Sequence, residues 1–112
     1  MKKIEAIIRP EKLELLRQQL ETVGYPGMMV TKIEGHGKQG GVRHQFRGLE
    51  YKVTFLPKIR IEIVSPDSQV KKLTDAITEV CRSGAVGDGK IFISSIENAI
   101  RIRTGESGEM AI

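Results

Sequence analysis

The order in which extended and helical patterns alternate along the chain is the feature that most restricts its fold. Four short segments are apolar and rich in β-branched residues, as strands are, and they lie at residues 4–8, 28–34, 58–64 and 90–95. A segment with helical periodicity follows the first and the third of them. The order βαββαβ predicts an α+β, ferredoxin-like fold with an antiparallel sheet. Both helices should cover one face, which leaves the other face to solvent or to another subunit.

Each predicted helix carries a stripe of apolar residues that should form the core. The stripes consist of Leu13, Leu16, Leu20 and Val23 in the first helix and of Val70, Leu73, Ile77 and Val80 in the second. Ser65, Pro66 and Asp67 precede the second stripe, and they predict its capped first turn. Cys81 falls at the end of that helix and is predicted to belong to the core. As the single cysteine it permits no internal disulfide, which fits a reducing compartment.

Length and composition restrict the organisation and the partners. A chain of 112 residues suits a single domain spanning 1–112, and 29% charged residues indicate a globular chain. The net charge of +4 suits nucleic acid, acidic lipid or phosphorylated small molecules, or only a solvated surface. The start of the chain does not resemble a signal peptide, and no stretch approaches the ~18–20 apolar residues of a membrane span. We therefore expect a cytoplasmic protein without direct membrane insertion.

A long connection, Gly35 to Pro57, separates the second and third predicted strands. Segments of roughly twenty residues without predicted structure are uncommon in compact domains and are usually functional or disordered. One interpretation is a β-hairpin extension that packs on itself. The preferred one is a flexible arm, about 36–56, that orders on a partner. Its apolar residues lie near the tip, where a monomer gains little from them: Phe46, Leu49 and Tyr51.

The last third of the chain carries groups suited to phosphate. Glycines in Gly87-Asp88-Gly89-Lys90 let backbone N–H groups turn toward an anion, and the lysine adds a charge. Arg101 and Arg103 lie two positions apart in a predicted extended tail, about 98–112, and would point to the same side. Two guanidinium groups on one side suit a polyphosphate. The alternative is that both arginines pair with surface glutamates. Together these groups favour a nucleotide site.

At these residues the chain resembles the PII signal-transduction family, whose members are trimeric regulators of nitrogen status. The resemblance runs essentially from end to end, in blocks at residues 2–10, 47–51, 55–58, 61–64, 87–92 and 100–106. It implies a homotrimer, not an enzyme, that binds ATP or ADP in clefts between subunits. It also implies that 2-oxoglutarate binds together with Mg²⁺ and ATP. The flexible loop would then regulate enzymes, kinases or ammonium channels.

The resemblance also implies roles for individual residues. The nucleotide-binding set would be Met29, Gly37, Lys38, Gln39, Val64, Gly87, Asp88, Gly89, Lys90, Arg101 and Arg103. Gln39 and Lys58 would bind 2-oxoglutarate, and Gln39 would also complete the coordination of Mg²⁺. Tyr51 matches a tyrosine that many relatives have uridylylated. Arg47, together with Tyr51, would dock partners, because Arg47 matches the residue that enters ammonium-channel pores.

Several positions depart from the family's usual residues. Lys38 replaces an arginine, so a bidentate grip on phosphate becomes a point contact. Gly40 replaces a lysine, which weakens oxoacid binding or loosens the arm, and Met29 replaces a threonine near the adenine. Glu11 and His36 both stand where phenylalanine is usual.

Two other function classes share parts of this pattern. RNA-binding modules of the same element order stack bases on aromatic residues of the central strands, but here those strands offer only Phe92. A small phosphate-ester hydrolase would need a base with a partner. His36 and His44 lie in the arm without one, although Asp88 could position a water molecule.

Overall fold

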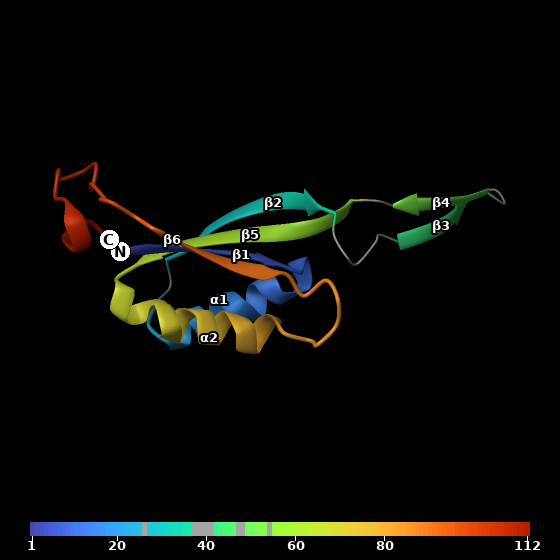
Figure 1. Ribbon diagram of the computed structural model, residues 1–112, viewed down its shortest axis with the longest axis horizontal. Helices are drawn as coiled ribbons and strands as arrows, with labels where there is room; N and C mark the ends of the chain where they lie inside the picture. The colour runs from blue at the N-terminus through green and yellow to red at the C-terminus, as the bar shows by residue number, and fades with distance from the viewer. Residues whose placement is uncertain (26, 37–41, 47–48, 54) are drawn as a thin grey trace.

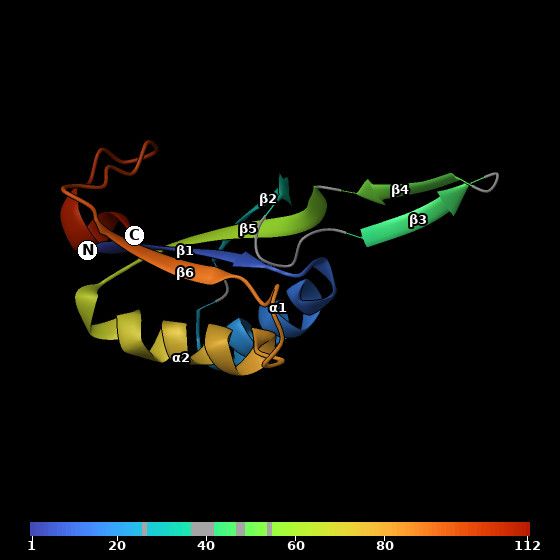
Figure 2. The same cartoon turned by 45° about the vertical axis from the view of Figure 1, so that its right-hand side comes forward.

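The computed structural model describes residues 1–25, 27–36, 42–46, 49–53 and 55–112, with the backbone alone for 42–46 and 49–53. It contains one four-stranded sheet with both α-helices on the same face (Figure 1). A two-stranded hairpin lies beyond one end of this sheet, and the chain measures 61 × 26 × 21 Å (Figure 2).

The elements follow the predicted order, with one pair of strands added. The strands are β1 (Lys2–Ile8), β2 (Met29–Gly35), β3 (Val42–Phe46), β4 (Leu49–Val53), β5 (Leu56–Ser65) and β6 (Lys90–Ser95). The α-helices are α1 (Leu13–Thr22) and α2 (Val70–Cys81), and short 3₁₀ helices lie at Pro10–Lys12, Asp67–Gln69 and Gly108–Ala111.

The main sheet has the strand order β2-β5-β1-β6 with antiparallel pairing throughout, which confirms the α+β, ferredoxin-like prediction. In the β1–β5 register Ile4 faces Ile63, and Ala6 faces Ile61. Residues directly opposite each other on paired strands share a face of the sheet. These four residues are at most 1% exposed and line the face that the helices cover.

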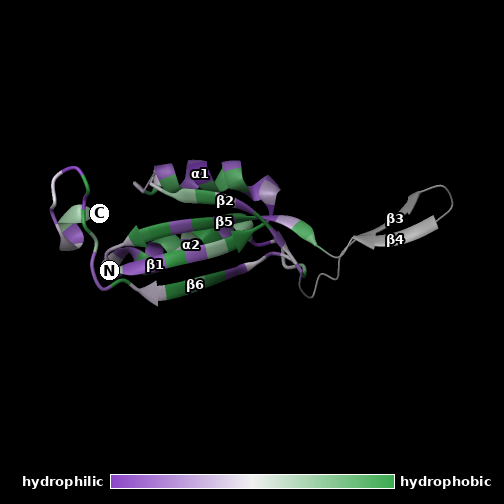
Figure 3. Cartoon of the chain, turned by 90° about the horizontal axis from the view of Figure 1, so that it is seen from above, coloured by the Kyte–Doolittle hydropathy of each residue, from purple (hydrophilic) through white to green (hydrophobic). Residues whose placement is uncertain are grey.

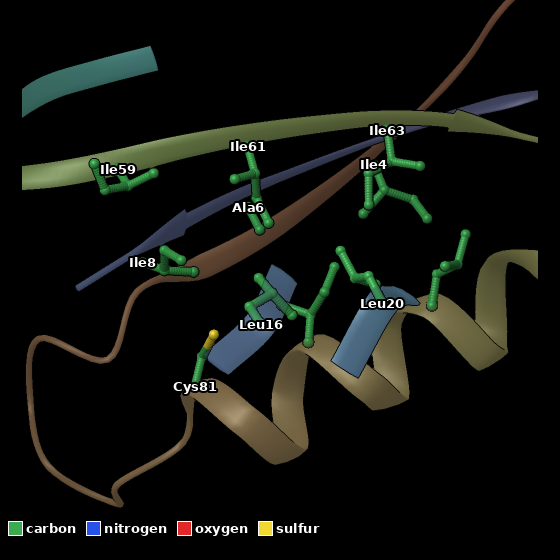
Figure 4. Close-up of a cluster of buried hydrophobic side chains, with 11 residues drawn as sticks. Ile4, Ala6, Ile8, Leu16, Leu20, Ile59, Ile61, Ile63 and Cys81 are labelled. Atoms are coloured by element: carbon green, nitrogen blue, oxygen red, sulfur yellow. The ribbon is translucent and has the colours of Figure 1, made fainter. Parts of the chain in front are cut away.

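The core lies between that face and the two helical stripes (Figure 4). Leu16 and Leu20 of α1 and Leu73 and Ile77 of α2 are buried, as predicted. Cys81 is 5% exposed and belongs to the core, which confirms its predicted place. Burial raises the pKa of its thiol to about 11, so it stays protonated at neutral pH.

The uncovered face of the sheet is charged near its centre. Lys3 lies 3.4 Å from Glu62, and Arg60 lies 3.3 Å from the same carboxylate. Hydrophilic and hydrophobic residues alternate along β1 and β5 in Figure 3, as they should when successive side chains take opposite faces.

The predicted start of the second helix is wrong. Ser65 is the last residue of β5 and is fully buried, because its pairing with Lys2 extends the sheet to that point. Its hydroxyl donates to the Pro66 carbonyl over 3.2 Å and caps no helix. Asp67 begins a 3₁₀ helix, and its carboxylate lies 2.9 Å from the amino terminus of Met1. The α-helix itself begins at Val70.

The long connection between β2 and β5 contains the hairpin formed by β3 and β4. Val42 pairs with Val53 at one end and Phe46 with Leu49 at the other. The backbone thus confirms the hairpin of the first interpretation. Whether its side chains pack on one another lies outside the described residues, and ordering on a partner stays a prediction.

The predicted extended tail is also wrong. Ile100 forms an isolated bridge with Ser107, and residues 102–104 make a turn. The Gly105 N–H closes this turn by donating to the Arg101 carbonyl over 2.7 Å. Gly105 has a φ of 76°, which favours glycine and lets the chain reverse. The premise that Arg101 and Arg103 project from one extended strand therefore fails.

Candidate functional site

The glycine-rich segment forms a loop, residues 82–89, between α2 and β6 at the hairpin end of the sheet (Figure 1). Gly87 and Gly89 have φ values of 105° and 104°, a region that side chains rarely adopt. A Cβ atom at Gly89 would lie 1.6 Å from the carbonyl oxygen of Ile7. The loop therefore presses its backbone against the end of β1, and only glycine fits there.

The carboxylate of Asp88 is used inside this loop. One of its oxygens accepts the backbone N–H groups of Ser83 and Gly84, each over 2.8 Å. The other accepts the Ser83 hydroxyl and lies 3.5 Å from Nε of Arg9. Hydrogen bonds from Ser83 are the main reason that the pKa of Asp88 falls to about 2. The carboxylate is thus ionised at neutral pH.

Two cations hold the carbonyls of Val86 and Gly87: Arg9, which directly follows β1, and Lys58 of β5. Nη2 of Arg9 donates to the Val86 carbonyl and Nζ of Lys58 donates to the Gly87 carbonyl, each over 2.9 Å. In a trans peptide the C=O of one residue and the N–H of the next point in opposite directions. The amides of Gly87 and Asp88 are therefore directed away from these cations. Neither amide makes a hydrogen bond of ordinary length and angle to a described residue, although residues 86 and 87 form a turn that brings the Asp88 N–H toward the Ala85 carbonyl.

Lys58 lies in a mixed electrostatic environment. Its pKa is lowered, first by partial burial and then by the charge of Arg9, while Glu11 and Asp88 act in the opposite direction. One cation, Arg9, and two anions, Glu11 and Asp88, surround Lys58. An acidic ligand there would be attracted by the cations and repelled by the two carboxylates. Glu11, one of the unusual residues, is the exposed member of this group.

The open sheet face carries the predicted apolar residues and one further cation, at different places. Met29 is opposite Glu62, and Val64 lies two residues further along β5, so both share that face. Lys90 is opposite Ile7 on the same face and is exposed. Val64 is opposite Lys3 at the start of β1, whereas Lys90 is opposite Ile7 near its end, and β2 and β6 are opposite edges of the sheet. Within one chain the loop thus has Lys90 beside it, and Met29 and Val64 lie away from it.

Arg101 and Arg103 do not reach this loop within one chain. The segment that carries them lies at the opposite end of the sheet (Figures 1 and 2). Arg101 donates to the Met110 carbonyl over 3.0 Å and lies 3.5 Å from Glu106, so the surface-pairing alternative is confirmed for Arg101. Arg103 is exposed in the turn.

The remaining predicted residues lie outside the described part of the chain. These are Gly37, Lys38, Gln39 and Arg47, and for Tyr51 only the backbone, in β4, is described. Within the described ranges no group of three or more His, Cys, Asp or Glu side chains could hold a metal ion. The predicted Mg²⁺ ligand, Gln39, is not among these ranges.

Sequence reasoning missed Arg9 and Ser83 as parts of the loop's structure. The sequence predicts no role for either residue, because Arg9 lies just past the first predicted strand and Ser83 just past the second predicted helix. The only available signal was their neighbourhood: Arg9 follows the strand that Gly89 approaches, and Ser83 lies five residues before Asp88.

The fold and the loop define a ferredoxin-like α+β domain with a glycine-rich turn after its second α-helix and a projecting hairpin. Residues 1–106 match the family described as nitrogen regulatory protein P-II. The chain is 54% identical to the P-II protein of Bradyrhizobium diazoefficiens and 53% identical to that of Pasteurella multocida, over all 112 residues and the full length of each relative. It is 48% identical to P-II 2 of Methanothermobacter thermautotrophicus, over the whole chain and 97% of that relative.

The chain therefore belongs to the nitrogen regulatory P-II family. Members of this family are signalling proteins and not enzymes, so the match favours neither the RNA-binding module nor the hydrolase. As a family they bind ATP or ADP and 2-oxoglutarate, and membership implies a homotrimer and regulated partners in nitrogen metabolism. No helix in the described residues has the length and apolar character needed to cross a bilayer.

Proposed function

We propose that this chain senses ATP or ADP by binding the phosphates at the backbone amides of Gly87 and Asp88, with Lys90 as the neighbouring charge. The observation that carries the proposal is the orientation of this turn. Arg9 and Lys58 hold the carbonyls on one side, and the two adjacent N–H groups on the other side make no hydrogen bond of ordinary length and angle to a described residue. Adjacent free amides at a glycine turn bind anions well.

The adenine would lie against an open sheet face near Met29 and Val64, which a neighbouring chain would supply because both residues lie away from the loop within one chain. In a homotrimer the far end of a neighbouring chain would supply Arg101 and Arg103 to the phosphates. This follows from their distance from the loop within one chain, which makes a site built by one subunit incomplete (Figure 2). The exposed Ile102, 100% accessible in the single chain, supports burial of this segment against another subunit. Gly37, Lys38 and Gln39 would complete the site from the base of the arm.

The oxoacid site would lie beside Lys58. Its ammonium is already at the loop, and Gln39 would hold Mg²⁺ together with ATP and 2-oxoglutarate. We further propose that this ligand redirects the arm, about 36–56, within a single domain of 112 residues. Arg47 and Tyr51 would then dock enzymes, kinases or channels in the cytoplasm, and Tyr51 would be the site of uridylylation.

Calorimetry with ATP tests the nucleotide proposal. We expect saturable binding by the wild type, and a loss on the order of tenfold for Lys90→Ala as one charge-assisted contact disappears. Lys72→Ala, on an exposed position of α2, is the matched control and should bind as the wild type does. Equal affinity for both variants would remove Lys90 from the site. Repeating the titration with Mg²⁺ and 2-oxoglutarate tests the oxoacid site, which predicts tighter ATP binding when both are present.

A further inference from the structure

The loop between α2 and β6 is stabilised internally by the side chain of Asp88, whose negative charge is unsuited to binding phosphate. Asp88 accepts two backbone N–H groups and one hydroxyl from Ser83 and Gly84, the two residues that lead away from α2. These bonds join the first and last parts of the loop. The Asp88 carboxylate thus links the two ends of the segment 83–88.

Arg9 connects the segment 83–88 to the end of β1. Its Nη2 holds the Val86 carbonyl over 2.9 Å, while Nε lies 3.5 Å from the Asp88 carboxylate. Nε is buried and makes no hydrogen bond among the described residues, so the charge of Asp88 is its nearest compensation. Loss of that carboxylate would leave a partly buried cation poorly balanced, and Arg9 would be held only through the Val86 carbonyl.

We propose that the side chains of Asp88, Ser83 and Arg9 are positioning groups that hold the loop in its anion-binding shape before a nucleotide arrives, and that the Asp88 carboxylate touches neither phosphate nor metal. The inference rests on the proposed nucleotide site. It assigns the carboxylate a different task from that of the amides beside it. Both oxygens of the Asp88 carboxylate already accept hydrogen bonds. A carboxylate that faced a polyphosphate would weaken its binding, because the two charges repel.

The preformed turn explains why this task matters. Gly87 and Gly89 are conformationally free in an unrestrained chain, and an ordered loop must overcome their entropy. Bonds made within the free protein remove this cost before the ligand binds, which raises affinity without any new contact to the ligand.

The test compares Asp88→Ala, Asp88→Asn and Ser83→Ala by calorimetry with ATP and with ADP, each with and without Mg²⁺. Asp88→Ala should weaken all four affinities by one common factor, on the order of tenfold. Asp88→Asn keeps one acceptor oxygen and should recover part of the loss. Ser83→Ala removes one donor and should lose less. Asp75→Ala is the matched control, because Asp75 is an exposed carboxylate on α2 that pairs only with Lys71 among the described residues.

Amide hydrogen exchange provides the readout that general destabilisation would not reproduce. The amides of Ser83 and Gly84 should exchange faster in Asp88→Ala, and they should be partly protected again in Asp88→Asn, while core amides of β1 stay unchanged. If Asp88→Ala does not fold, Asp88→Asn and Ser83→Ala carry the same comparison.

Three outcomes would overturn the inference, and they are distinguishable. Wild-type affinity in Asp88→Ala, with the Lys90→Ala defect intact, would refute the positioning role and leave the nucleotide site standing. A loss confined to Mg²⁺-ATP would make Asp88 a metal-side ligand. Absence of nucleotide binding by the wild type would refute the proposed function itself, and with it the positioning role of Asp88, Ser83 and Arg9.

Discussion

Replacing Gly89 by alanine should be among the most damaging single-methyl changes in this protein. The added Cβ would lie 1.6 Å from the Ile7 carbonyl oxygen and 2.7 Å from its carbonyl carbon. Both atoms are backbone, so no side-chain rotation relieves the contact. The loop would have to move away from β1, or Gly89 would have to leave its φ of 104°.

The expected cost follows from two effects. A side chain at this positive φ costs about 1–3 kcal/mol in strain. Displacing packed backbone to admit a methyl group costs about 1–3 kcal/mol more. The sum, about 2–6 kcal/mol, is a large share of the ~5–15 kcal/mol that stabilises an ordinary domain. For a chain of this size the melting temperature should fall by about 10 to 30 °C.

Gly84→Ala separates the two effects in the same loop. Gly84 has a φ of 88°, but a Cβ there would meet nothing within 4 Å. It should show only the strain, about 1–3 kcal/mol. Thermal denaturation followed by circular dichroism at one protein concentration measures both variants. Equal melting temperatures would refute the argument that the close approach to Ile7 decides the cost. Gly89→Ala should also lose ATP affinity, since the amide-presenting turn is displaced.

Three further perturbations test the core, the loop and the oxoacid site. Ile61→Ala should cost about 2–5 kcal/mol in urea denaturation, because its side chain is 1% exposed, whereas Leu15→Ala, at 53% exposed, should cost less than about 1 kcal/mol. The stability that ionised Asp88 contributes should be fully present above its ordinary pKa of 3.8 and lost as the pH falls through about 2, so thermal melts should show this acid-dependent loss in the wild type and not in Asp88→Asn. Glu11→Gln should tighten 2-oxoglutarate binding about two- to tenfold in calorimetry with Mg²⁺-ATP, because one carboxylate near Lys58 is removed.

Each of these has a result that would count against it. Similar losses for Ile61→Ala and Leu15→Ala would mean that the sheet–helix interface is not the core. An acid-dependent loss that persists in Asp88→Asn would assign it to other groups. Weaker oxoacid binding by Glu11→Gln would mean that Glu11 supports the site instead of opposing the ligand.

Most of the fold could be predicted because local patterns and tertiary packing agree. Ile59, Ile61 and Ile63 alternate with charged residues, and they are the residues that β5 buries. The second helix start was misread because Ser65 has the chemistry of a cap, while its pairing with Lys2 keeps it in the sheet. Strand pairing is a long-range effect that the local sequence around Ser65 does not reveal.

The site was predictable in composition but not in geometry. The glycines and Lys90 were visible from their chemistry. That Asp88 would turn its carboxylate toward Ser83 and Arg9 was not, because Arg9 lies far away in the sequence and meets the loop only through β1. The spacing of Arg101 and Arg103 was read as a strand, whereas Gly105 permits the turn that reverses the chain there.

The central claim is that the outward-facing amides of residues 87 and 88 receive the phosphates. A titration of ¹⁵N-labelled protein with ATP, followed by amide NMR spectra, tests it most directly. The account predicts the largest shifts at Gly87, Asp88 and Lys90, with Ser83 and Gly84 changing little because Asp88 already holds them. Binding that leaves the resonances of Gly87 and Asp88 unmoved would contradict the account.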